Sequence, residues 1–215
     1  MIKRLSGGIL LVTFGLTLGA SGGSMNWNFD AGPANQPPAG FSFSRTGQGR
    51  LGTWTIQKDN QPPSGDYVLA QLDTDNTSYR FPVAVANEPI LGDLRVSVRC
   101  KPVSGKVDQA CGLVLRYRDG NNYYVARANA LEDNVRFYSV AGGKRHELAS
   151  WSGKVASGTW HTLSVEAKAD RFEVFWNNQK VIDTRDATFA EPGKIGLWTK
   201  ADSVTYFDDL IVEAL

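Results

Sequence analysis

The feature of this chain that most constrains its fold is an alternation of apolar and polar residues with a period of two. It is clearest in residues 94–100, 134–139 and 160–167. Successive side chains of a β-strand point to opposite faces, so each run predicts a strand with one buried face. After residue 24, no window of 11 or more residues keeps the apolar spacing of an amphipathic helix. The chain is therefore predicted to be all-β.

Turn residues separate these runs at regular intervals. Gly, Asn and Asp gather in 118–122, 141–144 and 177–179, and these residue types tolerate the positive φ of tight hairpins. Roughly a dozen evenly spaced strands are typical of an antiparallel two-sheet jelly-roll sandwich, which is the predicted fold. No internal repeat, low-complexity tract or linker divides the chain, so residues 25–215 are predicted to form one domain.

The first 24 residues have the pattern of a secretory signal peptide. Two bases, Lys3 and Arg4, precede the apolar run 9–18 and the small-residue stretch 19–24. The apolar run is short beside the roughly 20 residues that span a bilayer, so no stable membrane span is expected after cleavage. We expect a secreted or periplasmic protein. An uncleaved anchor and a translation start at Met25, which would leave the protein in the cytoplasm, remain as alternatives.

The charge balance narrows the classes of partner. The chain has 23 Lys+Arg and 22 Asp+Glu, a formal charge of +1, whereas nucleic-acid modules carry a strong basic excess. Two His leave little material for a His-rich metal site or a Ser/His/Asp triad. We therefore expect no nucleic-acid partner and no required cofactor.

Two cysteines lie at the facing ends of the strand-like runs 94–100 and 111–117. If these runs pair as a long-looped hairpin, Cys100 and Cys111 come within reach of a disulfide, which an exported location favours. A pair of free buried thiols is the alternative in a cytoplasmic chain.

Several motifs resemble those of a known superfamily. Residues 158–166 (GTWHTLSVE), 171–175 and 177–182 resemble the core of concanavalin A-like, laminin-G-type domains. Residues 193–199 (GKIGLWT) and 206–212 (YFDDLIV) resemble the end of the same domains. Within the superfamily, the chain looks most similar to secreted bacterial domains described as 3-keto-disaccharide hydrolase-like or family-16-glycosidase-like. The resemblance implies a jelly roll, a fold that serves enzymes, lectins and adhesion modules alike, and so it indicates the fold more than the function.

One hairpin departs from the family pattern. Asn178 or Gln179 stands where the family usually has Gly, so an Asn is expected to take the positive φ.

Candidate catalytic residues are sparse. Laminarinase-type members of the superfamily place their acids on one strand as E-x-D-x-E, and this chain has no such triplet. Glu166, Asp170 and Glu173 have a turn between them, and the adjacent Glu132 and Asp133 would point to opposite faces of a strand. His161 is expected to be a core or edge histidine. Hydrolysis by paired carboxylates is therefore disfavoured, while a route through a single acid remains open.

A ligand face is better supported, because polar and aromatic residues alternate along three consecutive predicted strands. Guanidinium groups and amides pair with sugar hydroxyls, and aromatic rings stack on sugar C–H faces. The candidate ligand residues, with two tryptophans as stacking platforms, are Arg116, Tyr124, Arg127, Asn129, Asn134, Arg136, Trp151 and Trp198. Arg127 and Asn129 are two apart and should face the same way. The alternative is that these are solvated strand residues and core tryptophans.

Calcium is the one metal that the sequence suggests. Related jelly rolls hold Ca²⁺ where the first and last strands meet, and Asp30, Asp208 and Asp209 supply oxygen ligands from both ends of the chain. Simple capping of turns by these Asp residues is the alternative.

These observations predict an exported domain that binds carbohydrate on its concave sheet. A glycoside hydrolase acting on a keto-disaccharide or related sugar, and a structural or adhesive envelope protein, are the alternatives. The protein partner stays open.

Overall fold

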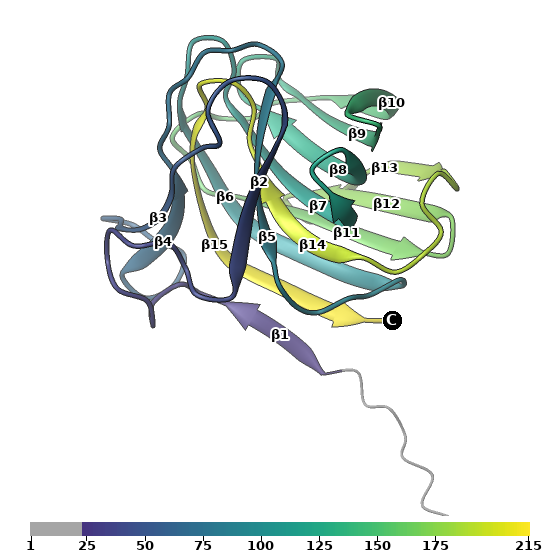
Figure 1. Cartoon of the computed structure of the whole chain (residues 1–215), viewed down its shortest axis with the longest axis horizontal. Helices are drawn as coiled ribbons and strands as arrows, with labels where there is room; N and C mark the ends of the chain where they lie inside the picture. Colours follow the sequence, from purple (N-terminus) through teal and green to yellow (C-terminus); the bar gives the residue numbers. More distant parts are fainter. Residues whose placement is uncertain (1–22) are drawn as a thin grey trace, which may run out of the picture.

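The chain folds as two antiparallel β-sheets packed face to face. The computed structural model describes residues 23–215, which contain fifteen strands and no helix. Figure 1 shows the two layers and the long loops gathered at one end. The predicted all-β two-sheet fold is confirmed. No helix of residues 23–215 is long and apolar enough to cross a membrane, and residues 1–22 of the predicted signal peptide lie outside the described residues.

The eight-stranded sheet has the order β13-β12-β11-β6-β15-β4-β3, with β1 also paired to β15. Its strands are β1 (Ser24–Trp27), β3 (Trp54–Lys58), β4 (Tyr67–Gln71), β6 (Leu94–Ser104), β11 (His161–Lys168), β12 (Arg171–Trp176), β13 (Gln179–Arg185) and β15 (Val204–Ala214). Its pattern of burial follows the period of two. In β6, for example, Leu94, Val96 and Val98 face the other sheet while Arg95 faces solvent.

The seven-stranded sheet has the order β10-β9-β8-β7-β14-β5-β2. Its strands are β2 (Phe41–Gly47), β5 (Arg80–Ala86), β7 (Ala110–Asp119), β8 (Asn122–Asn129), β9 (Asn134–Ala141), β10 (Lys144–Ser152) and β14 (Lys194–Trp198). All seven residues of β5 are buried, which shows that this sheet is covered on both faces.

The main core fills the space between the sheets. Tyr124 and Phe137 come from the seven-stranded sheet and pack against Phe172 of β12, with ring centroids 4.7–5.7 Å apart. Burial of aromatic side chains of this size stabilises the fold by about 2–3 kcal/mol each.

A second apolar cluster covers the outer face of the seven-stranded sheet. Trp198 stacks on Phe81 at 5.3 Å, and its indole N–H donates to the Tyr123 hydroxyl at 3.2 Å. Both Phe81 and Trp198 are fully buried. The Arg145 guanidinium lies 4.4 Å from the centre of the Phe81 ring and helps to close the cluster. Much of the outer face of the seven-stranded sheet, which the alternation predicted to be exposed to solvent, is therefore buried in this second cluster.

Loops close over this second cluster at one end of the molecule. Arg80, fully buried, donates from Nε to the carbonyl of Arg50 at 2.8 Å and also bonds the carbonyl of Ala201. Its Nη2 lies 3.1 Å from Asp73. One side chain thereby ties together the β2–β3, β4–β5 and β14–β15 loops, which lie side by side in Figure 1.

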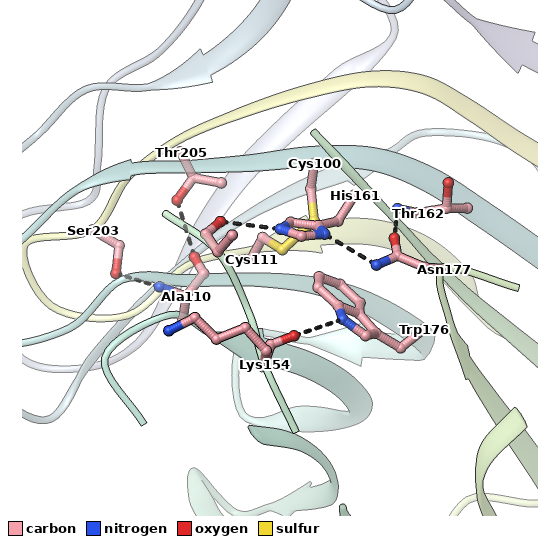
Figure 2. Close-up of a disulfide and its surroundings, with 11 residues drawn as sticks. Cys100, Ala110, Cys111, Lys154, His161, Thr162, Trp176, Asn177, Ser203 and Thr205 are labelled. Carbon is pink, nitrogen blue, oxygen red and sulfur yellow. Dashed lines mark hydrogen bonds between the residues drawn. A yellow bond between two sulfur atoms is a disulfide. The ribbon is translucent and has the colours of Figure 1, made fainter. Parts of the chain in front are cut away.

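The predicted disulfide between Cys100 and Cys111 is confirmed, but the expected hairpin is wrong. Cys100 belongs to β6 of the eight-stranded sheet and Cys111 to β7 of the seven-stranded sheet, with their Cα atoms 6.3 Å apart. The bond therefore joins the two sheets through the core (Figure 2). The chain crosses between sheets in the intervening stretch, and alternation within each run carries no information on which sheet it joins.

The hairpin between β12 and β13 uses asparagine as expected. Asn177 and Asn178 have φ values of 49° and 66°. Asn is among the residues that reach this region at low cost, so the missing family Gly does not disturb the turn.

Candidate functional site

The outer face of the seven-stranded sheet gathers polar side chains near the turn from β8 to β9. Arg127 and Asn129 both point to this face, as their spacing predicts, because Ala126 and Ala128 alternate with them and pack in the main core. Asn134 and Arg136 lie opposite them in register, so four of the predicted ligand residues come together here.

Arg127 forms the rigid base of this polar group. Its side chain is only 2% exposed, and its guanidinium donates to Glu132 at 2.8 Å and to the Tyr138 hydroxyl at 3.3 Å. It also donates to Asn134 Oδ1. Burial alone raises the pKa of Glu132, but the charge of Arg127 and hydrogen bonds from Asn134 and Arg127 outweigh it and hold that pKa below its usual value.

Asn129 braces the turn rather than meeting solvent. It is 1% exposed, its Nδ2 donates to Asp108 at 2.7 Å, and its Oδ1 accepts from the Leu131 N–H at 2.9 Å. Asp108 also pairs with Lys200. Burial raises the pKa of Asp108 above its ordinary value despite that ammonium group.

The groups that solvent can reach lie around Arg136. Its side chain is 34% exposed, and its guanidinium lies 3.0 Å from Glu147 and 3.8 Å from Glu132, both of which are partly exposed. The guanidinium carbon of Arg145 lies 4.9 Å from the centre of the Tyr138 ring. We call this group the Tyr138 cluster; its members are Arg127, Glu132, Asn134, Arg136, Tyr138, Arg145 and Glu147.

One exposed aromatic ring borders the cluster. Tyr79, in the β4–β5 loop, is 44% exposed, and its hydroxyl donates to the Gly143 carbonyl at 2.8 Å and accepts from the Arg145 N–H at 3.3 Å. These bonds fix the ring beside the β9–β10 hairpin.

The other predicted ligand residues lie elsewhere. Tyr124 points into the main core, where its hydroxyl donates to Asp186 at 2.6 Å. Trp198 is closed inside the outer cluster, and Trp151 packs partly buried against the main core. Arg116 is buried because its positive φ of 48° at a β-bulge reverses the alternation, and it donates to the Phe189 carbonyl at 2.7 Å. The structure thus places these four side chains in structural roles.

The three predicted calcium ligands do not converge. Among the described residues, no group of three or more His, Cys, Asp or Glu side chains has the arrangement of a metal site. Asp30 Oδ1 accepts from the N–H groups of Asp66 and Tyr67 at 2.9 and 3.1 Å. Gly65 packs so closely that a Cβ there would lie 1.8 Å from Asp30 Oδ2.

Asp208 and Asp209 hold the same loop from the other side. Ser64 N–H donates to Asp208 Oδ2 at 3.1 Å, and Ser64 Oγ donates to Asp209 Oδ1 at 2.8 Å. Burial raises the pKa of Asp208 to about 7. These residues fit loop anchoring better than they fit a calcium ion.

His161 and the nearest acid pair have structural partners. His161 is 7% exposed, lies 3.0 Å from the Ala156 carbonyl through Nε2, and accepts from Asn177 at 3.2 Å, beside the disulfide (Figure 2). Glu166 and Glu173 face each other in register on the outer face of the eight-stranded sheet. Both are held in surface ion pairs, as in the 2.9 Å contact from Arg95 to Glu166.

Comparison with known proteins places the chain in a family. The family model described as a 3-keto-alpha-glucoside-1,2-lyase-like domain matches residues 47–213. The chain belongs to this family. The resemblance inferred from the motifs is therefore confirmed, and the match covers β3 to β14, nearly all of β15 and the whole Tyr138 cluster.

A curated relative and two solved structures are similar to the chain. Levanase of Bacillus subtilis (strain 168) is 29% identical over 99 residues, which are 45% of this chain but only 14% of the levanase. The carbohydrate binding module CBM66 from Bacillus subtilis superposes with a TM-score of 0.66 at 21% identity, over 81% of this chain and 96% of that chain. A protein of unknown function with a galectin-like fold, also from Bacillus subtilis, gives 0.56 at 12% identity, over 81% and 89%. These likenesses agree on the jelly-roll fold.

Sequence reasoning weighed Glu132 only as a catalytic acid, and it missed three residues that border or belong to the Tyr138 cluster, namely Tyr79, Arg145 and Glu147. Arg145 and Glu147 are two apart on β10, so alternation alone would have put them on one face. The position of Tyr79 depends on how the β4–β5 loop folds over the sheet, and no local pattern signals that.

Proposed function

We propose that this protein is an exported carbohydrate-binding domain whose ligand lies against the Tyr138 cluster. The observation that carries the proposal is the set of partly exposed groups Glu132, Arg136 and Glu147, held on one face by the buried Arg127. Guanidinium groups donate to sugar hydroxyls and carboxylates accept from them, and an exposed ring such as Tyr79 offers a surface for sugar C–H groups.

Rigidity favours binding on this face. Arg127 and Tyr138 are almost fully buried and hydrogen-bonded to each other, so the exposed groups around them are positioned before any ligand arrives. A site that is ordered in advance loses less conformational entropy on binding. The carbohydrate binding module and the levanase among the similar proteins support a sugar as the ligand.

The test removes the exposed ion pair between Arg136 and Glu147 and leaves the buried Arg127 intact. We expect the double variant Arg136→Ala, Glu147→Ala to lose about tenfold or more in affinity for the glycans that the wild type binds on a glycan array. The matched control is Arg95→Ala, Glu166→Ala, which removes an exposed Arg–Glu pair with a 2.9 Å contact on the outer face of the other sheet. Wild-type-like retention by the first variant would place the site elsewhere, and a wild type that binds no glycan would overturn the proposal.

A second candidate function is the elimination reaction that the family description names. Lys200 lies 4.0 Å from Glu132 and also pairs with Asp108, and the pKa is raised for Asp108 and lowered for Glu132. The Lys200 ammonium and the Glu132 carboxylate thus set a proton donor beside a proton acceptor. In a 3-keto-glucoside, Glu132 would take the proton from carbon 2. The electron pair would form the C1–C2 double bond, the C1–O bond would break, and the leaving alcohol would take a proton from Lys200.

Turnover decides between the two candidates. If the second is right, the wild type releases the alcohol from a 3-keto-disaccharide and Glu132→Gln abolishes the release, while the control Glu166→Gln does not. A wild type without turnover rejects the lyase and leaves the binding proposal unchanged.

Export is supported by the signal-like segment and by the disulfide, because disulfides persist in oxidising compartments. In cell fractionation, the full chain should appear outside the cytoplasm in a shortened form. Removing residues 1–22 should retain it inside; a full-length chain in the cytoplasmic fraction would contradict export.

A further inference from the structure

A pocket lies on the same face of the seven-stranded sheet as the Tyr138 cluster, at the opposite end of that face. This pocket has a volume of about 300 Å³ and is formed by β2, β5, the end of β7 and the segment before β14. Its volume is at the lower end of the range for small-molecule sites, which suits a single ring rather than a large ligand. It is separated from the Tyr138 cluster by roughly 16 Å along β7, as judged from the rise per residue between Gly112 and Tyr117.

The floor of the pocket is apolar and fixed. Tyr117 stacks on Tyr123 with ring centroids 5.9 Å apart, and its hydroxyl donates to Ser44 Oγ at 2.8 Å. Ile90, 54% exposed, and Pro192 add further apolar surface. The two loops that hold these residues are joined by a pair of backbone hydrogen bonds between Leu91 and Gly193, each 3.0 Å. The pocket therefore exists without a ligand to shape it.

The rim of the pocket carries two cations that lack acidic partners. Arg118 is exposed and Lys194 is half-buried, and within residues 23–215 neither forms an ion pair. Of the described residues that line the pocket, none is acidic. Arg118 is steadied by the Phe189 ring, 5.1 Å from its guanidinium carbon. The adjacent Asp119 is engaged in its own turn, where it accepts from the Asn121 N–H at 2.7 Å.

These two cations select a charged ligand. A guanidinium and an ammonium at the edge of an apolar floor leave charge uncompensated when a neutral ring occupies the site, whereas a carboxylate forms charge-assisted hydrogen bonds to both. Sugar C–H groups pack on an apolar and aromatic floor; Ser42, whose hydroxyl donates to Asn87 Oδ1 at 2.6 Å, also lines the pocket.

We propose that this pocket binds the carboxylate-bearing ring of a uronic acid, so that the preferred ligand is an acidic oligosaccharide. The inference rests on the proposed function in one respect, since it takes the ligand to be a carbohydrate. Arg118 and Lys194 hold the carboxylate, and Tyr117 supports the ring. The remaining sugar rings of the oligosaccharide extend toward the Tyr138 cluster on the same face.

The experiment compares one acidic ligand with its neutral counterpart by calorimetry. The probes are trigalacturonate and carboxyl-reduced trigalacturonate, which differ only in the carboxyl groups. We expect the wild type to prefer the acidic trisaccharide by about tenfold or more at low salt. The double variant Arg118→Gln, Lys194→Gln should lose that preference while still binding the neutral trisaccharide as the wild type does.

The control variant is Lys58→Gln, Lys168→Gln, which removes the same charge from exposed positions on the other sheet. It should keep the preference. Equal loss in both variants would show a general effect of net charge, and no preference in the wild type would show that the pocket is not selective; either result overturns the inference. If neutral glycans bind and that binding depends on Arg136 and Glu147, the proposed function stands even so. If no glycan binds, both fail.

Discussion

At the scale of single residues, Asp208 is the group whose charge state most affects stability. It is fully buried, with its carboxylate bonded to Ser64 and to the Asp209 N–H. Burial raises its pKa to about 7, and the neighbouring Asp209 carboxylate adds to the rise, although the N–H donors oppose it. The folded chain thus prefers the protonated form, whereas the unfolded chain ionises near pH 4. Its contribution to stability is complete below about pH 4 and declines as the pH rises through about 7.

Replacement of Asp208 by Asn should remove this dependence. The amide keeps the shape of the neutral acid, so we expect the free energy of unfolding of Asp208→Asn to exceed that of the wild type by about 1–3 kcal/mol at pH 8, with little difference at pH 4. Urea unfolding at both pH values measures it. A constant difference between the two proteins across this range would show that Asp208 is ionised in the folded state.

Arg127 and Arg136 are neighbours, but their replacement by Ala should lower the free energy of unfolding by different amounts. Arg127→Ala leaves Glu132 and Asn134 without their main donor, and a buried group without its partner costs about 2–4 kcal/mol of unfolding free energy. Arg136→Ala removes a partly exposed ion pair and should cost less than about 1 kcal/mol. Thermal unfolding of the two variants checks the order. Similar losses would show that the cluster is not held by Arg127.

At the scale of strands, the disulfide is the covalent link between the two sheets. It closes a loop across a sequence separation of 11 residues, and closure of such a loop stabilises a fold by about 2–3 kcal/mol in the chain-entropy description. We expect Cys100→Ala, Cys111→Ala to lower the free energy of unfolding, measured with urea, by that amount. A reductant should destabilise the wild type equally without affecting the variant. A variant as stable as the oxidised wild type would show that the core alone fixes the two sheets.

The strands themselves followed from the sequence, but their partners did not. Alternation along β6 and β11, and Asn at the β12–β13 turn, indicated strands and a hairpin that the structure contains. Trp198, predicted to be a stacking platform, lies closed in the outer cluster instead, because a strand buried on both sides has no polar side to mark it. Residues from distant loops, such as Tyr79, depend on tertiary packing. Arg116 was misplaced because a β-bulge shifts the period by one residue.

At the scale of the whole molecule, the two outer faces differ in what they can do. The outer face of the eight-stranded sheet pairs its charges across neighbouring strands, as in the contacts of Arg171 with Asp183 and of Lys180 with Glu173. In the middle of the outer face of the seven-stranded sheet lies the buried apolar cluster around Trp198. The Tyr138 cluster lies at one end of this face, and the pocket lined by Tyr117, Arg118 and Lys194 lies at the other. A ligand that uses both ends must therefore be extended, which is a property of oligosaccharides.

β1 is the first described strand, and its pairing limits where the proposed signal peptide could be cleaved without loss of sheet structure. β1 lies beside β15, with which it pairs at residues 210–213 (Figure 1). Trp27 packs on Phe41 with ring centroids 5.9 Å apart. Cleavage within 19–24 keeps this strand, whereas cleavage beyond Trp27 removes it. We expect the free energy of unfolding of a chain that starts at Asn28 to be about 2–3 kcal/mol lower than that of a chain that starts at Gly23. The shorter chain loses the β1–β15 pairing and the buried surface of the Trp27 indole. Mass spectrometry of the exported protein and thermal unfolding of the two chains test this together. A mature terminus beyond Trp27, or equal stability of the two chains, would show that β1 is dispensable and that the domain starts later.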